Sequence, residues 1–228
     1  MLNDKIYHLK EKRFYMIIVV SHTKGGVGKS TISFNLATAL RATYNIEVID
    51  LDFQKTVTYI NEYREEPLTV KGFDSDEAFK NYIREDSDQR VTIIDVGGFD
   101  SSMNRMAMVV ADLIITPVSD SSTELLGIMK FEKILKEMSA VFEEEIGVHV
   151  LLNHINPQKK NLNDVKKFIE KTPLFTLLKS STPTRALYDK ALGRGFGVLE
   201  YEPNSKASEE MQKLVNEIDE IIKDKING

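Results

Sequence analysis

The sequence contains the glycine-rich motif Lys24-Gly25-Gly26-Val27-Gly28-Lys29-Ser30-Thr31. An apolar run, Met16–Val20, precedes this motif, and Ile32–Leu40 after it has the apolar spacing of a helix. A strand, a glycine-rich turn and a helix in this order form a phosphate cradle, because glycines let backbone N–H groups approach an anion and the helix N-terminus adds partial positive charge. Lys29 can reach the outer phosphates, and Ser30 offers a hydroxyl to Mg²⁺. The motif therefore predicts binding of a nucleoside triphosphate.

Composition limits the class of protein. The chain has 228 residues, 42% of them hydrophobic and 29% charged, which is enough for one substantial core. We expect residues 1–15 to be a charged extension and residues 16–228 to form a single domain. No stretch approaches the roughly eighteen apolar residues of a membrane span, and the extension has no apolar signal region, so we expect a cytoplasmic protein with no membrane partner. The absence of cysteine excludes disulfides, iron–sulfur clusters held by thiolates, and cysteine zinc sites.

Runs of β-branched residues that end in an acid recur along the chain. Ile46–Asp50 and Val91–Asp95 predict buried parallel strands, whose carboxyl ends meet at the sheet edge where ligands bind. Helical segments separate these runs, so the predicted fold class is α/β, with a mostly parallel twisted sheet flanked by helices on both faces, as in P-loop NTPases. We expect Asp95 to hold Mg²⁺ through water. The next pair, Gly97-Gly98, predicts either a mobile loop near the γ-phosphate or a plain strand-to-helix turn.

The glycine-rich motif departs from the general G-x-x-x-x-G-K-[ST] pattern, because Thr23 stands where the first glycine would be and Lys24 is an additional lysine. With this second lysine the segment resembles the deviant Walker A motif of the ParA/MinD family of ATPases, most closely the ParA-type partition ATPases. The resemblance implies that ATP and Mg²⁺ are the cofactors, that the ATP-bound protein is a homodimer, and that Lys24 contacts phosphates held by the partner subunit. Lys24 and Lys29 would both be catalytic. The nucleotide-binding residues would be Lys24, Gly25, Gly26, Val27, Gly28, Lys29, Ser30 and Thr31.

The segment Val48–Gln54 resembles the second motif of this family. By that match Asp52 is the catalytic aspartate that orients or polarises the attacking water, and it joins Ser30 and Asp95 at the metal. Asp50 would be a neighbour in the same network. The residues alone are equally compatible with Asp50 and Asp52 capping a helix that begins near Lys55.

Leu151-Leu152-Asn153 ends another predicted strand, Val148–Asn153, and resembles the family position whose asparagine touches the adenine base. An amide can read a base edge with its donor and its acceptor together. Asparagine is also an ordinary turn residue at a strand end. His149 and His154 lack metal-ligand spacing, so we expect no metal site there.

The charge balance reverses between residues 159 and 194, where nine Lys or Arg face three Asp or Glu in a chain of net charge −5. A basic segment in an acidic protein predicts a localised patch. In ParA proteins the corresponding region binds duplex DNA without sequence preference, so the resemblance implies phosphate contacts from Lys179, Arg185 and Arg194. Solvated lysines on exposed helices explain the same pattern, since no groove-reading motif accompanies them. Ser180–Ala186, followed by Gly193–Glu200, resembles the family's C-terminal pattern of a loop near the base, a helix and a glycine turn.

Taken together, the motifs predict a ParA-like partition ATPase. ATP would drive dimerisation and non-specific DNA binding on the nucleoid, and slow hydrolysis, stimulated by a ParB-like or other partner, would dissolve the dimer. The same motifs fit a relative that positions a protein cargo.

Two further alternatives share the fold. A MinD-like regulator would cycle on a membrane, but the predicted C-terminal helix Ala207–Ile222 has an acidic polar face that an anionic membrane would repel, so we expect this helix to dock on the core. An ATP-dependent ligase of the dethiobiotin synthetase type would need a small-substrate pocket, and no residue cluster in the sequence indicates one.

Overall fold

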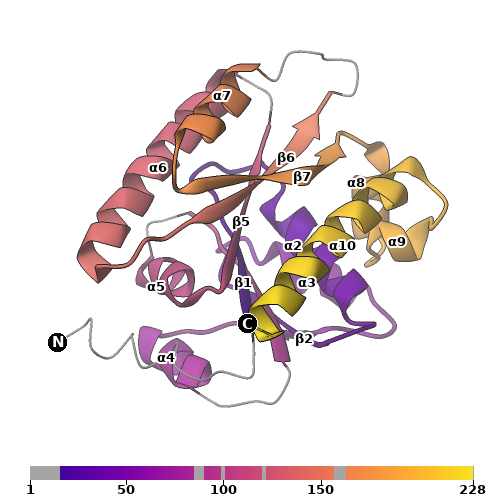
Figure 1. The fold of residues 1–228 in the computed structure, drawn as a ribbon. Coiled ribbons are helices and arrows are strands. Elements are labelled where there is room, and N and C mark those ends of the chain that lie inside the picture. Colours follow the sequence, from indigo (N-terminus) through magenta and orange to yellow (C-terminus); the bar gives the residue numbers. More distant parts are fainter. Residues whose placement is uncertain (1–15, 85–89, 99–100, 120–121, 157–162, 228) are drawn as a thin grey trace.

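The computed structural model describes residues 16–84, 90–98, 101–119, 122–156 and 163–227 (Figure 1). These residues form one seven-stranded sheet in the order β3-β2-β4-β1-β5-β6-β7, in which every neighbouring pair is parallel. The strands are β1 (Met16–Val20), β2 (Asn45–Asp50), β3 (Thr69–Lys71), β4 (Arg90–Asp95), β5 (Leu113–Val118), β6 (Val148–Ile155) and β7 (Phe175–Pro183).

Helices cover both faces of this sheet. Core residues of α4, α5, α6 and α7 pack on one face, and those of α2, α3, α8, α9 and α10 pack on the other (Figure 1). The helices are α2 (Lys29–Leu40), α3 (Thr56–Glu62), α4 (Asp76–Arg84), α5 (Ser102–Val110), α6 (Ser122–Phe142), α7 (Asn163–Lys171), α8 (Ala186–Leu192), α9 (Val198–Tyr201) and α10 (Lys206–Asn227). The predicted α/β class, a parallel sheet between two helical layers, is confirmed.

Strand β1 shows why the central strands read as continuous apolar runs. Ile17 and Val19 belong to the core under α4–α7, whereas Ile18 and Val20 belong to the core under α2 and α8–α10. All four side chains are fully buried. A strand covered on both faces has no polar side, so its sequence cannot alternate.

The order in which strands are added to the sheet reverses at β1. From β1 the chain passes through α2 to β2 on one side of the sheet, while β5, β6 and β7 extend the sheet on the other side. Ligands of open α/β sheets bind at the carboxyl edge where the strand order reverses in this way. The glycine-rich motif lies at that point, directly after β1.

Strand β7 is the main difference from the sequence-based expectation. In the segment Ser180–Ala186, which resembled a loop followed by a helix, Ser180 to Pro183 are the last residues of β7 and Ala186 begins α8, so only Thr184 and Arg185 lie between these elements. This strand lies at the sheet edge and pairs only with β6, and exposed side chains such as Thr176 and Lys179 interrupt its apolar pattern. An edge strand of mixed polarity gives no apolar run that a sequence pattern could recognise.

The C-terminal helix docks on the core as predicted. Its residues Met211, Leu214, Ile218 and Ile222 have no exposed surface, and they pack in the cluster that contains α2. Helix α10 continues to Asn227, beyond the predicted end. The apolar face of α10 is therefore covered within this chain.

Candidate nucleotide-binding site

The glycine-rich motif forms one wall of a cavity of about 480 Å³ at the carboxyl edge of the sheet. Gly28 ends the loop at φ +92°, a left-handed conformation that side chains disfavour. A Cβ atom at Gly28 would lie 2.3 Å from the amide nitrogen of Asn153, so no larger residue fits there. Helix α2 begins at the next residue, Lys29, and its first residues line the cavity, the position that a helix N-terminus has in anion-binding sites.

Lys29 lies in this loop rather than in solvent. The residue is only 7% exposed, and its Nζ donates a hydrogen bond to the backbone oxygen of Lys24, 3.4 Å away. Among the described residues, the Lys29 ammonium group has this single long hydrogen bond, although it can donate three. Lys29 is therefore placed to bind an anion in the loop.

Ser30 and Asp95 meet beneath the loop. The Ser30 hydroxyl donates to Asp95 Oδ2 at 2.6 Å, and the Ser33 hydroxyl donates to Oδ1 at 3.0 Å. Burial is the main reason that the pKa of the Asp95 carboxyl is raised to about 7; the nearby Asp50 carboxylate also raises this pKa, and the two hydroxyl donors and Lys29 lower it. A fully buried carboxylate that lacks a cation is costly, which a bound metal would relieve.

These oxygen atoms fit Mg²⁺. Mg²⁺ takes one or two protein oxygens and completes its shell with water and substrate phosphates. In the described parts of the chain, no group of three His, Asp or Glu side chains is arranged as a metal cage. Ser30 and Asp95 would hold such an ion, whose charge would neutralise bound phosphate oxygens.

We expect the substitution Asp95→Asn to stabilise the nucleotide-free protein at pH 8 and to stabilise it much less at pH 5. The folded-state pKa of about 7 lies above the ordinary aspartate value of 3.8, so the carboxyl group lowers the free energy of unfolding progressively as pH rises from about 4 through 7. The upper bound on the gain at pH 8 is about 4 kcal/mol. Thermal unfolding of wild type and variant at both pH values measures this gain in stability. An equal gain at pH 5 and pH 8 would show that the buried Asp95 charge does not cause it.

The same variant should lose the Mg²⁺ dependence of ATP affinity.

The structure gives Asp50 and Asp52 different positions. Asp50 is fully buried, and its Oδ2 accepts hydrogen bonds from the backbone N–H and the hydroxyl of Thr58 at 2.9 and 2.8 Å. It thus caps the first turn of α3, as the capping alternative predicts for this residue. Asp52 instead lines the cavity, with Oδ1 accepting from the backbone N–H of Gln54 at 2.9 Å. A Cβ at Gly97 would lie 3.4 Å from that carboxylate, so the backbone after β4 closely approaches Asp52.

Asn153 is buried between the loop and the sheet edge. Its Nδ2 donates to the backbone oxygen of Val27 at 2.6 Å, and its Oδ1 accepts from the Thr182 hydroxyl at 2.7 Å. Both ends of the amide therefore connect the glycine-rich loop to β6 and β7. The contact to adenine remains a prediction. The exposed His154, which the sequence analysis set aside, lines the cavity next to Gly28.

Lys24 lies at the rim of the cavity and points toward α6. Its Nζ is 3.0 Å from Glu124 Oε2 and 3.3 Å from the Thr123 hydroxyl. The sequence analysis did not identify Glu124, because an acid in the first turn of a helix is common at any helix N-terminus. Its proximity to Lys24 arises only when β5 pairs beside β1.

The predicted basic patch is divided between the two faces of the molecule. Lys166, Lys167 and Lys171 lie on α7, whereas Arg185 and Arg194 flank α8 on the opposite face of the sheet. The expectation of one localised patch is therefore wrong for the described part of the segment, because β7 passes between the two helices. Lys159 and Lys160 lie outside the described residues.

The three candidate DNA residues differ in their surroundings. The Arg185 guanidinium forms two hydrogen bonds with the Glu210 carboxylate, at 2.6 and 3.2 Å, which raise the pKa of Arg185 above its usual value. The backbone N–H of Lys179 donates to Glu217 at 2.8 Å. The exposed Arg194 lies over the ring of Tyr201, 5.9 Å from its centroid. The Arg185 side chain is therefore paired with a carboxylate, whereas the exposed side chains of Lys179 and Arg194 have no ion pair with a carboxylate among the described residues.

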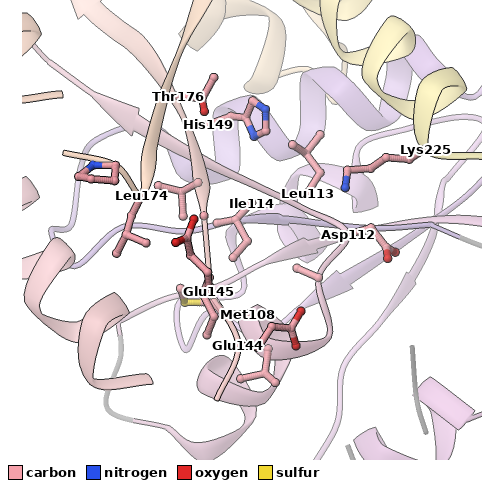
Figure 2. Close-up of a pocket in the computed structure, with 16 residues that line it drawn as sticks. Met108, Asp112, Leu113, Ile114, Glu144, Glu145, His149, Leu174, Thr176 and Lys225 are labelled. Carbon is pink, nitrogen blue, oxygen red and sulfur yellow. The ribbon is translucent and has the colours of Figure 1, made fainter. Parts of the chain in front are cut away.

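A second cavity of about 500 Å³ lies at the opposite edge of the sheet, where β5, β6 and β7 begin (Figure 2). His149, Thr176 and Lys225 line one part, and Glu144 and Glu145 line another (Figure 2). Burial lowers the pKa of His149, and Lys225 lowers it further. None of the predicted site residues lies in this cavity.

A membrane-spanning helix is absent from the described ranges, since none of their helices combines the required length and apolarity.

Comparisons with known proteins agree with this arrangement. Residues 18–191 match the model of the CobQ/CobB/MinD/ParA nucleotide binding domain. The chain is 22% identical over 207 residues to "Maintenance of carboxysome distribution protein A" of Halothiobacillus neapolitanus. This alignment covers 88% of this chain and 95% of that protein. The chain is also 26% identical over 146 residues to Protein ParA of Rhizobium radiobacter, and this alignment covers 62% of this chain and 65% of that protein. The structure of the cell division ATPase MinD of Pyrococcus furiosus superposes with a TM-score of 0.68 at 17% identity, covering 90% of this chain and 99% of that one. The family match includes every residue that lines the 480 Å³ cavity.

Proposed function

Because the chain belongs to the CobQ/CobB/MinD/ParA family of nucleotide-binding domains, we propose that it is an ATP-driven dimerisation switch of the ParA/MinD kind. Mg²⁺–ATP binds in the cavity behind the glycine-rich loop and joins two copies of the chain. Hydrolysis then separates them. The switch serves to position a cargo inside the cell.

One observation supports this proposal most strongly: four polar side chains with different tasks line a single cavity, and a fifth lies directly behind one of them. Lys24, Lys29, Ser30 and Asp52 line the cavity, and the buried Asp95 accepts a hydrogen bond from Ser30. A nucleotide whose phosphates occupy the loop would have the helix N-terminus and Lys29 against its charge. Asp52 would then lie near the outermost phosphate, where it can accept a hydrogen bond from the attacking water.

Exposed apolar side chains on both sides of the cavity favour a face that a second copy covers. Phe53, next to Asp52, is 96% exposed, and Leu126 and Met129 on α6 are 69% and 46% exposed. Clusters of this kind around a polar site are typical of protein interfaces.

The experiment that tests the enzymatic part is the release of inorganic phosphate from Mg²⁺–ATP, compared between the wild-type protein and Lys29→Ala. We expect slow turnover that the variant loses, because Lys29 contacts the phosphates in both the ground state and the transition state. Lys133, an exposed lysine on α6, provides the matched control Lys133→Ala. Equal turnover in wild type and Lys29→Ala would assign the phosphate release to a contaminant and remove the catalytic role.

We further propose that the ATP-bound dimer binds duplex DNA through the α8 side of the molecule. Two copies present their basic residues on one surface, and such contacts release counterions from DNA, so binding should weaken steeply with salt. The name of the relative ParA is consistent with a partition role. The pairing of Arg185 with Glu210 makes Arg194 the stronger candidate for a phosphate contact.

The expected result is that Arg194→Ala lowers the salt dependence of DNA binding by about one unit of slope, whereas Lys167→Ala, on the opposite face, leaves it unchanged. Fluorescence anisotropy with a random-sequence duplex, in ATP and in ADP at several salt concentrations, measures this. Equal binding in ATP and ADP, or none in either, would argue against a nucleotide-controlled DNA tether. The proposal would then move to a protein cargo, which the name of the carboxysome-distribution relative suggests.

A further inference from the structure

The contact between Lys24 and Glu124 is the least expected feature of the site. In the proposed dimer, Lys24 must contact phosphates bound by the other subunit, yet here its Nζ lies 3.0 Å from Glu124 Oε2 of its own chain. The Lys24 side chain is 41% exposed, whereas the Glu124 side chain is only 3% exposed. The acid is therefore fixed in the fold, and the lysine is the group that can move.

The Glu124 carboxylate depends on few partners. Besides Lys24, its Oε2 accepts a hydrogen bond from the Ser119 hydroxyl at 2.7 Å. Its other oxygen, Oε1, is buried and has no hydrogen-bond partner among the described residues. Burial opposes ionisation of Glu124, but Ser119 and Lys24 together hold its pKa below the usual value. If Lys24 departs, a buried carboxylate loses its principal countercharge, and this is strongly unfavourable.

His22 lies next to both residues. Its Nδ1 accepts a hydrogen bond from the backbone N–H of Lys24 at 2.9 Å, so the remaining hydrogen of the neutral ring is on Nε2. That Nε2 is also buried and without a partner in the described structure. A Cβ at Gly127 would lie 3.9 Å from His22 Nε2 and 3.7 Å from Glu124 Oε1. An unused donor and an unused acceptor thus border the same small space, which exists because residue 127 is glycine.

We propose that Glu124 restrains Lys24 in the nucleotide-free subunit and that ATP-driven dimerisation must break this contact, with His22 Nε2–H becoming the new partner of Glu124. We call the Lys24–Glu124 pair the latch. The latch regulates the proposed switch, so this inference rests on the proposed function. Since breaking the latch consumes part of the free energy of dimerisation, it sets the threshold at which two ATP-bound subunits associate.

The latch predicts that Glu124→Gln strengthens dimerisation. Glutamine preserves the size of the side chain and an oxygen acceptor, but it removes the charge that holds Lys24. We expect the dimer dissociation constant, measured by sedimentation with Mg²⁺ and a non-hydrolysable ATP analogue, to fall by about fivefold or more. Glu132→Gln is the matched control, because Glu132 is on the same helix and, among the described residues, forms an ion pair only with Lys136, one turn away.

A second variant tests the role of His22. His22→Asn keeps an acceptor for the Lys24 backbone N–H but removes Nε2, so Glu124 loses its replacement partner and we expect a weaker dimer. Thermal unfolding of both nucleotide-free variants verifies that they are folded.

The outcomes are distinguishable. If the wild-type protein does not dimerise with the ATP analogue, the proposed function fails. If it dimerises and Glu124→Gln dimerises equally or more weakly, the proposed function stands and the latch is refuted.

Discussion

Lys24→Ala is expected to abolish ATP-driven dimerisation and to reduce ATP hydrolysis by about a hundredfold or more, while the isolated subunit still binds Mg²⁺–ATP. The side chain of Lys24 lies at the cavity rim and contacts α6, whereas Lys29 lies in the loop where phosphates would bind. Removal of Lys24 therefore leaves the phosphate site of its own subunit intact. What it removes is the charge available to the other subunit. Fluorescent-nucleotide binding, sedimentation and phosphate release measure the three quantities separately.

A double variant tests whether a loss of fold stability, rather than the loss of the Lys24 charge at the interface, explains that result. Lys24→Ala also leaves the buried Glu124 carboxylate without its cation, which destabilises the fold. In Lys24→Ala/Glu124→Gln this charge is absent, so stability should recover while dimerisation and hydrolysis do not. An ATPase rate equal to wild type in either variant would refute the role of Lys24 across the interface.

Asp52→Ala is expected to trap the ATP-bound dimer. Among the described residues, the Asp52 carboxylate accepts one hydrogen bond, from the backbone N–H of Gln54, and it lines the cavity. Its removal should therefore disturb the fold little. Without it the attacking water loses its orienting acceptor, and we expect phosphate release in a single turnover to slow by about a hundredfold. The lifetime of the dimer in Mg²⁺–ATP should increase accordingly.

The control for Asp52 is Asp74→Ala, a substitution at an exposed acid before α4 that does not line the cavity. This variant should behave as wild type. Rapid phosphate release by Asp52→Ala would exclude Asp52 from the mechanism.

The core of the fold was predictable because it depends on local patterns. A buried parallel strand needs an apolar run, and the runs at β1, β2 and β4 each lead into a motif that carries charge. Parallel strands place their carboxyl ends at one edge, so the sequence also indicated that the loop, Asp52 and Asp95 lie together. Strand β7 was missed because an edge strand with exposed Thr176 and Lys179 has no such run.

Contacts between residues that are far apart in the sequence could not be predicted. Glu124 contacts Lys24 across one hundred positions, and Asn153 contacts Val27 across 126. The basic segment shows the converse error, since residues close in sequence on α7 and α8 lie on opposite faces of the sheet. Proximity along the chain predicts proximity in space only within one element.

The mass of the protein in solution tests the central claim most directly. Sedimentation equilibrium with Mg²⁺ and a non-hydrolysable ATP analogue should give twice the 25.9 kDa of the chain, and with Mg²⁺–ADP it should give the mass of one chain. The same mass in both nucleotides, whether of one chain or of two, would contradict an ATP-driven dimerisation switch.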